Sequence, residues 1–309
     1  MNKWRNTFIC LSLIKKIFMI KYQHLYDLSI YEEAQEDFMS TYVMSDIHGC
    51  YTAFKDLLNK IGFTDDDQLI IAGDIVDRGP ENYEMLKWFE SCPENVTFLL
   101  GNHDEEFAYY CSVFAVCMTN TEARKKIDYY VMNPGASLKN MDRYGTLREL
   151  IRDHGCDEND FQIWSDMIRK LPYYKKLTIN DRNYIVVHAG YIDEDREDLS
   201  KLLKMYNYSD IRQYYTWARD DALDIGGVPD TTIIFGHTPT IAETAYYTGG
   251  TVFTYESRII NSKFINIDCG YVYNVRFRTA NLAAIRLEDE KIFYLEDIAG
   301  VTSNDHKNE

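Results

Sequence analysis

The chain has 309 residues and a formal net charge of −16, so its acidic surface disfavours nucleic acids and anionic membranes as partners. Its length and its 46% hydrophobic content allow one large domain with a buried core. The seven cysteines are scattered, odd in number and without a C-x-x-C pair, which argues against a disulfide framework or a thiolate zinc site and favours a reducing cytoplasm.

The first 38 residues differ from the rest of the chain. Their apolar stretch, residues 8–20, is too short to span a bilayer and contains two lysines. A signal peptide is the alternative, although no small-residue cleavage site follows the stretch. Because the first predicted strand begins just after Met39, we expect residues 1–38 to be a dispensable extension. Residues 39–302 would then form the folded domain, and residues 303–309 a polar tail.

Five short apolar runs predict buried strands, and polar motifs with Asp, His or Asn follow them directly. The runs are Tyr42–Met44, Leu69–Ala72, Val96–Leu100, Tyr184–Val187 and Ile233–Phe235. In an open α/β sheet, ligands bind beyond the carboxyl ends of the strands. The pattern therefore predicts that the residues after the five runs meet at one edge.

Other segments predict the elements between and after these strands. Apolar residues at helical spacing predict helices over residues 51–61 and 83–89. Residues 105–176 predict a mostly helical insertion with a break at residues 133–135. Short β-like runs after His237 predict a second sheet packed on the first, and they cover residues 264–267, 283–287 and 292–295.

The polar residues after the five strands form short motifs. They are Ser45-Asp46-Ile47-His48-Gly49, Gly73-Asp74-Ile75-Val76-Asp77-Arg78-Gly79, Gly101-Asn102-His103-Asp104, His188-Ala189-Gly190 and Gly236-His237-Thr238. Each alone is a common turn or capping sequence, but their repetition after buried strands is not explained by turns. Asp, His and Asn without cysteine are ligands for borderline divalent ions such as manganese, iron or zinc.

A pair of adjacent metal ions needs a shared anionic ligand, and Asp74 in the middle motif is the candidate. The other candidate ligands are Asp46 and His48 for one ion, and Asn102, His188 and His237 for the second. Metal binding at such a site lowers the pKa of a bound water to about 7, so hydroxide is available at neutral pH. The motifs therefore indicate hydrolysis of a phosphoryl group by direct attack of metal-bound hydroxide.

Departure of the leaving oxygen needs a proton, and His103 is the candidate acid because it adjoins Asn102. Either Asp77 or Asp104 would be the carboxylate partner that raises the pKa of His103 and fixes its tautomer. Arg78 offers a planar guanidinium for two phosphoryl oxygens.

Taken together, the motifs resemble those of the calcineurin-like metallophosphoesterases, and among these the bacterial-type phosphoprotein phosphatases. The resemblance covers about Thr41 to Leu295. It implies an α/β fold in which a β-sandwich, flanked by helices and carrying a helical insertion, holds the metals at its edge. Periodicity alone would suggest a single open sheet. The resemblance also implies that residues 39–302 form a catalytic domain with two divalent ions, Mn²⁺ ahead of Fe or Zn.

The resemblance assigns roles to matching positions. It implies metal ligands at Asp46, His48, Asp74, Asn102, His188 and His237, a general acid at His103 oriented by Asp77, and phosphate contacts from Arg78 and Asn102. Trp217-Ala218-Arg219 resembles the family's Trp-x-Arg segment, which would make Arg219 a second phosphate ligand; an ordinary arginine on a helix surface is the alternative. Ser45 replaces the usual first glycine, and we expect it to leave metal binding intact.

Three functions fit these motifs. The first is a serine/threonine protein phosphatase acting on a phosphorylated protein or a small phosphoester. The second is a symmetrical dinucleoside-tetraphosphate hydrolase, a branch that tends to lack the equivalent of Asp77 and to place an aromatic residue after its last histidine. Asp77 and Thr238-Pro239 in this chain favour the phosphatase. The third is an inactive binding scaffold, although no ligand is missing. The sequence leaves the oligomeric state open.

Overall fold

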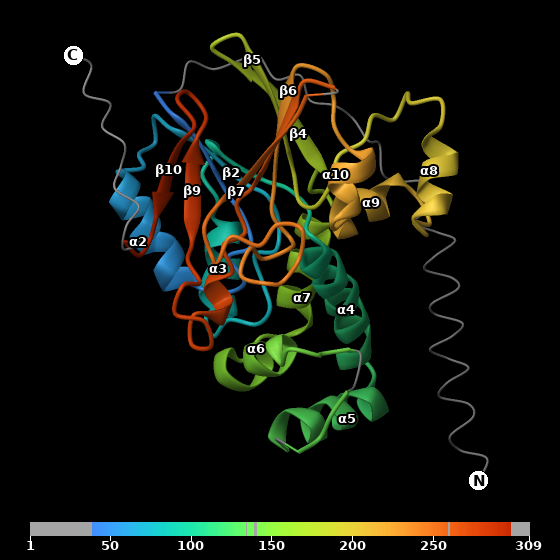
Figure 1. The fold of residues 1–309 in the computed structure, drawn as a ribbon. Helices are drawn as coiled ribbons and strands as arrows, with labels where there is room; N and C mark the ends of the chain where they lie inside the picture. The colour runs from blue at the N-terminus through green and yellow to red at the C-terminus, as the bar shows by residue number, and fades with distance from the viewer. Residues whose placement is uncertain (1–38, 134, 139–140, 259, 298–309) are drawn as a thin grey trace. The chain divides into compact units, whose positions relative to one another are not determined.

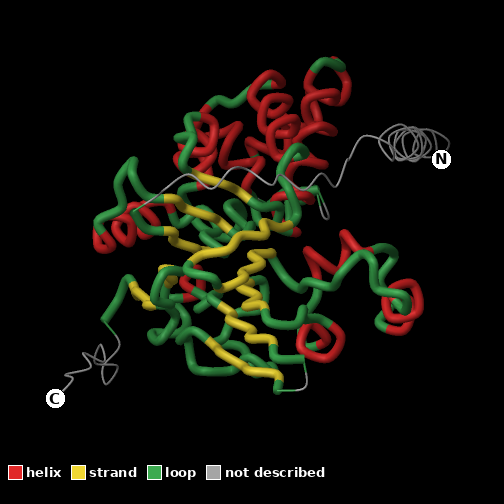
Figure 2. Tube along the Cα trace, turned by 90° about the horizontal axis from the view of Figure 1, so that it is seen from above, coloured by secondary structure: helices red, strands yellow, loops and turns green. Residues whose placement is uncertain are grey.

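The computed structural model of the chain describes residues 39–133, 135–138, 141–258 and 260–297. The predicted extension and tail therefore lie outside the described residues, as does Pro134 of the predicted break. Within this part of the chain, the strands form two five-stranded sheets, with helices on the outer sides of the strands (Figures 1 and 2).

The first sheet has the strand order β10-β9-β1-β2-β3. Its strands are β1 (Thr41–Met44), β2 (Gln68–Ile71), β3 (Val96–Phe98), β9 (Ala283–Arg286) and β10 (Lys291–Tyr294). Strands β1, β2 and β3 are parallel, whereas β9 is antiparallel to β1. The three motif-bearing strands of this sheet therefore end at one edge.

The second sheet has the strand order β4-β5-β6-β8-β7. Its strands are β4 (Tyr174–Ile179), β5 (Arg182–Val187), β6 (Thr231–Phe235), β7 (Phe253–Ser257) and β8 (Ser262–Asn266). The motif-bearing strands β5 and β6 are parallel to each other. All five predicted motif strands are thus confirmed, and they are divided between two sheets.

Two predictions about the sheets need correction. The single open sheet suggested by periodicity is wrong, and the two-sheet α/β fold implied by the resemblance is confirmed. The runs predicted at residues 283–287 and 292–295 form β9 and β10, which extend the first sheet because β9 pairs with β1. Only the run at residues 264–267 contributes, as β8, to the second sheet.

A layer of aliphatic side chains fills the space between the sheets. Val43 and Ile70 of the first sheet pack in one cluster with Val186, Ile234 and Ile265 of the second. Alternate residues of the same strands, such as Met44, point to the opposite face and pack under helices. Burial on both faces explains why these strands appear in the sequence as continuous apolar runs.

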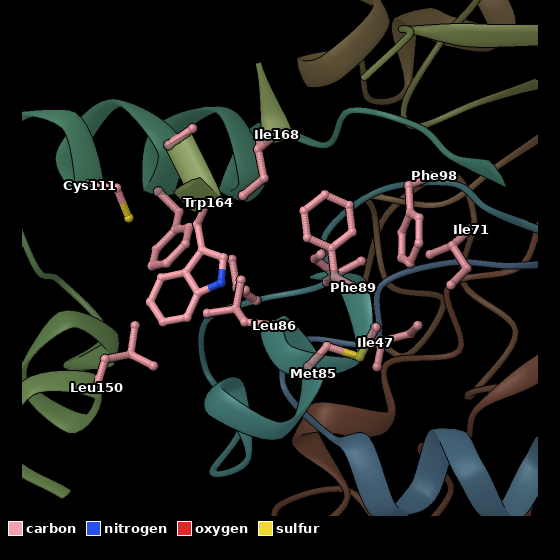
Figure 3. Packing of buried hydrophobic residues seen from close by; sticks show 14 of the residues in the cluster. Ile47, Ile71, Met85, Leu86, Phe89, Phe98, Cys111, Leu150, Trp164 and Ile168 are labelled. Atoms are coloured by element: carbon pink, nitrogen blue, oxygen red, sulfur yellow. The ribbon is translucent and has the colours of Figure 1, made fainter. Parts of the chain in front are cut away.

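Among the described residues, six helices lie on the first sheet's side. They are α2 (Tyr51–Ile61), α3 (Asn82–Glu90), α4 (Asn102–Met118), α5 (Thr121–Met132), α6 (Thr146–His154) and α7 (Glu158–Ile168). In Figure 3, Trp164 of α7 lies near Leu86 of α3, and Phe89 lies near Phe98 of β3. The rings of Phe89 and Phe98 meet edge to face at 4.8 Å. Residues 105–176 are mostly helical as predicted, but β4 already begins at Tyr174.

In the part of the chain that the structure describes, three short helices pack on the second sheet, and no apolar pattern predicted them. They are α8 (Leu199–Met205), α9 (Ile211–Trp217) and α10 (Asp221–Ile225). Tyr214 and Tyr215 of α9 are fully buried against this sheet. No helix in the described part of the chain has the length and apolarity needed to cross a membrane.

Candidate metal centre

The loops after the five motif strands adopt an unusual backbone conformation. Half of the twelve non-glycine residues with positive φ in the described chain belong to these motifs: Asp46, His48, Asp74, Asp77, Arg78 and His237. A non-glycine residue in this region costs roughly 1–3 kcal/mol. Such strain persists only where the surroundings enforce it, so hydrogen bonds must hold these loops.

Asp104 supplies several of those bonds. Its fully buried carboxylate accepts hydrogen bonds from the backbone N–H groups of Asp74 at 2.7 Å, Ile75 at 2.9 Å and Gly101 at 3.0 Å. It therefore caps helix α4 and ties the second and third motif loops together. Asp104 and Asp77 were the two predicted carboxylate partners of His103. Asp104 binds these backbone groups, and Asp77 contacts the His103 ring.

Glycines let the loops approach the candidate ligands closely. A Cβ on Gly236 would overlap Oδ2 of Asp46 and Oγ of Ser45, and a Cβ on Gly101 would overlap Oδ1 of Asp74. Ser45 itself has no positive φ and is buried against Gly236. The serine is accommodated because the neighbouring strand end carries a glycine.

The first group of candidate ligands surrounds Nε2 of His48. This nitrogen lies 3.6 Å from Oδ2 of Asp74 and 4.0 Å from Oδ1 of Asp46. The other ring nitrogen, Nδ1, bonds the carbonyl of Val76 at 2.9 Å, so Nε2 is left as the acceptor that faces the carboxylates. Oδ1 of Asp46 is buried without a hydrogen-bond partner. A cation would satisfy this orphaned oxygen, and Nε2 of His48 lies beside it as a further ligand atom.

The second group gathers around Nε2 of His188. This atom lies 3.0 Å from Oδ1 of Asn102, 3.2 Å from Nδ1 of His237 and 3.5 Å from Oδ1 of Asp74. Because Nδ1 of His188 bonds the carbonyl of Ala72 at 2.8 Å, its Nε2 is an acceptor, and it faces the acceptor oxygens of Asn102 and Asp74. The convergence of acceptor atoms fits a bound cation.

Asp74 belongs to both groups, through different carboxylate oxygens. All six candidate ligands are at most 6% exposed. Burial lowers the pKa of His48 and of His237, so both imidazoles are neutral and able to coordinate. Burial also raises the pKa of Asp74, and a nearby cation would oppose this change. The residues therefore fit two divalent ions that share Asp74.

The candidate general acid is held by a chain of hydrogen bonds. Nδ1 of His103 lies 2.8 Å from Oδ2 of Asp77, and the Thr146 hydroxyl donates to Oδ1 of Asp77 at 2.6 Å. Burial alone would lower the pKa of His103, but the carboxylates of Asp74 and Asp77 raise it above its ordinary value. No motif pointed to Thr146, which lies in the insertion, 69 positions after Asp77.

The two candidate phosphate arginines border the ligands. Nη2 of Arg78 lies 2.7 Å from Nε2 of His103, and Nη1 contacts Nε2 of His48. Arg219 is exposed and lies in the loop after helix α9, so the alternative of an arginine on a helix surface is wrong. Its Nη1 donates to the hydroxyl of Thr238 at 3.2 Å, beside His237. Both guanidinium groups are within reach of an anion bound at the centre.

A family model for calcineurin-like phosphoesterases matches residues 39–264. The chain belongs to this family. It accordingly has the metallophosphoesterase fold, and two groups of its His and Asp residues could hold metal ions.

Curated relatives of this metallophosphoesterase are named symmetrical bis(5'-nucleosyl)-tetraphosphatases. One from Buchnera aphidicola of Acyrthosiphon pisum is 54% identical over 67 residues, which are 21% of this chain and 24% of the relative. Another from Buchnera aphidicola of Baizongia pistaciae is 29% identical over 182 residues, or 59% of this chain and 49% of the relative. The matches thus span about a quarter to a half of these relatives' lengths.

Among solved structures, the chain is similar to a protein serine/threonine phosphatase from Saccharomyces cerevisiae. The sequence identity is 16%, the TM-score is 0.47, and the alignment covers 84% of this chain and 80% of the other.

Proposed function

We propose that the chain hydrolyses phosphoric anhydrides of nucleotides, with symmetrical dinucleoside tetraphosphates as the first candidate substrate. One observation carries the hydrolytic part of the proposal: the two Asp74 oxygens face His48 and His188 separately. The names of the curated relatives support the nucleotide substrate over the protein substrate that the motifs favoured. We further propose that the enzyme acts in the cytoplasm with Mn²⁺, and that iron or zinc are the alternative metals.

The residues divide the work as follows. Asp46, His48, Asp74, Asn102, His188 and His237 would hold two divalent ions. When bound, such ions lower the pKa of a water ligand and neutralise phosphoryl charge. Arg78, Arg219 and the amide of Asn102 orient the phosphoryl oxygens. His103 gives its proton to the leaving oxygen, and Asp77 fixes the ring so that Nε2 faces the centre.

A serine/threonine protein phosphatase is the second candidate, and the hydrogen-bonded chain from Thr146 through Asp77 to His103 favours it. A serine or threonine alkoxide is a poor leaving group that needs a proton. A nucleoside diphosphate leaves as a stable anion, so its departure depends less on protonation. An inactive scaffold is not favoured, because the described residues include every candidate ligand and the candidate acid.

The discriminating experiment compares three substrates at equal concentration in the presence of Mn²⁺. These are diadenosine tetraphosphate, a phosphothreonine peptide and p-nitrophenyl phosphate, ranked by kcat/KM. We expect diadenosine tetraphosphate to rank first and to yield only ADP. Turnover of the peptide without turnover of the dinucleotide would establish the second candidate. Metal-loaded protein that turns over none of the three would contradict both.

A further inference from the structure

Two exposed aromatic side chains lie at the candidate metal centre, and the proposed chemistry uses neither. Trp217 at the end of α9 is 41% exposed, and its ring centroid lies 6.0 Å from that of His237. Tyr144, just before α6, is 36% exposed, and its ring centroid lies 5.0 Å from that of His103. Their position, and not their exposure alone, sets them apart, because each exposed ring packs against a histidine of the centre.

The two rings lie at different ends of the centre. His237, which Trp217 contacts, belongs to the ligand group around His188, whereas His103 lies with the group around His48. Only Asp74 is common to both groups. A phosphate chain lying over the ions would therefore have one aromatic ring beyond each end.

Each ring is accompanied by a cation. Arg219 lies two residues after Trp217 and reaches Thr238 with its guanidinium. The guanidinium carbon of Arg78 lies 5.6 Å from the ring centroid of Tyr144 and 5.8 Å from that of Tyr273. Each of the two exposed rings is therefore paired with one of the candidate phosphate arginines.

The segment that follows Tyr273 in the chain carries two arginines. Residues 270–282 contain Arg276 and Arg278 and no acidic residue, although the whole chain carries a net charge of −16. Such a local reversal of charge suits a ligand with several phosphates better than one with a single phosphoryl group.

We propose that Trp217 and Tyr144 are two stacking sites for the two nucleobases of a dinucleoside polyphosphate, whose phosphate chain lies over the centre between them. Stacking on an aromatic face tolerates any base, because every base presents a π-face. The inference rests on the proposed function for its substrate class, and it adds the residues that recognise the nucleosides. It also gives a reason for symmetrical cleavage, since a base held at each end centres the phosphate chain over the ions.

The test measures binding, so that it does not depend on turnover. Mn²⁺-loaded full-length protein is titrated calorimetrically with a methylene-bridged, non-hydrolysable analogue of diadenosine tetraphosphate, and with inorganic tripolyphosphate, which has no bases. Trp217→Ala and Tyr144→Ala are each expected to raise the Kd of the analogue about ten-fold, and the double variant about a hundred-fold. The Kd of tripolyphosphate should change less than about two-fold in every variant.

Two further variants separate stacking from damage to the fold. Trp217→Phe keeps an aromatic face and should bind the analogue as the unmodified protein does. Tyr129→Ala removes a 65% exposed tyrosine of α5 and should change neither Kd. An equal rise in the Kd of the analogue and of tripolyphosphate would overturn the proposal. So would a rise in the Kd of the analogue for only one of the two alanine variants. If the predicted binding pattern is found but diadenosine tetraphosphate is not cleaved, the proposed reaction falls and the stacking sites stand.

Discussion

Nδ1 of His103 lies 2.8 Å from Oδ2 of Asp77, so the ring of the candidate acid is oriented with Nε2 toward the centre. The contact joins the third motif loop to the second. Since Thr146 binds the other oxygen of Asp77, the helical insertion also supports the acid.

Replacing His103 with asparagine should lower kcat on a phosphothreonine peptide by about 10²- to 10⁴-fold, the usual contribution of general acid catalysis. The loss should be smaller on p-nitrophenyl phosphate, because its phenolate leaves without a proton. Steady-state kinetics on both substrates tests the role, with metal content measured in parallel. An equal loss on both substrates would show that His103 does not act as an acid.

Replacing Asp77 with asparagine should change the pH profile. The acid works only while His103 is protonated, so kcat falls as pH rises through the His103 pKa. Asp77 helps to raise that pKa, and its removal should therefore move the alkaline fall of kcat to lower pH. The measurement is kcat against pH for both proteins with the same metal. An alkaline limb that does not move would remove Asp77 from this role.

Replacing Asp104 with asparagine should lower the free energy of unfolding, because Asp104 has a structural role and not a catalytic one. The buried carboxylate accepts three backbone N–H bonds, and an amide oxygen accepts them less strongly. We expect a loss of about 2 kcal/mol or more in the free energy of unfolding, as is typical for hydrogen bonds to a buried charged group. Urea unfolding measures it, with the exposed Asp153→Asn variant as the control. Equal stability of the two variants would contradict the capping role.

Replacing Gly236 with alanine should disrupt metal binding, because the new methyl group would overlap Oδ2 of Asp46. Gly135→Ala is the matched control, since open space surrounds that position. Metal analysis and thermal unfolding of the two variants test the prediction. Full metal content in Gly236→Ala would mean that the Asp46 loop can move aside, and that close packing there is not required.

The site was more predictable than the sheets that hold it. Asp46, Asp74 and His188 follow buried parallel strands, whose continuous apolar runs are visible in any sequence. Strands β9 and β10 gave an equally clear signal as strands, but a local pattern does not state which neighbour a strand pairs with. Their assignment to the wrong sheet follows from that limit.

Residues that support the site from a distance were harder to predict. Thr146 lies in a segment without a ligand-type motif, and only the fold brings its hydroxyl to Asp77. The Trp-x-Arg resemblance pointed to Arg219, and only the fold shows that Trp217 packs beside His237. Strands β4 and β7 lie at the edges of the second sheet, and the mixed or exposed side chains of their residues leave little periodic pattern.

The central claim is that two metal ions share the carboxylate of Asp74. Elemental analysis of the full-length protein after reconstitution with Mn²⁺ and removal of free metal tests it most directly. We expect two ions per chain in the unmodified protein and loss of both in Asp74→Ala, because each ion loses a ligand. Fewer than two tightly held ions in the unmodified protein, or two ions retained by Asp74→Ala, would contradict the account.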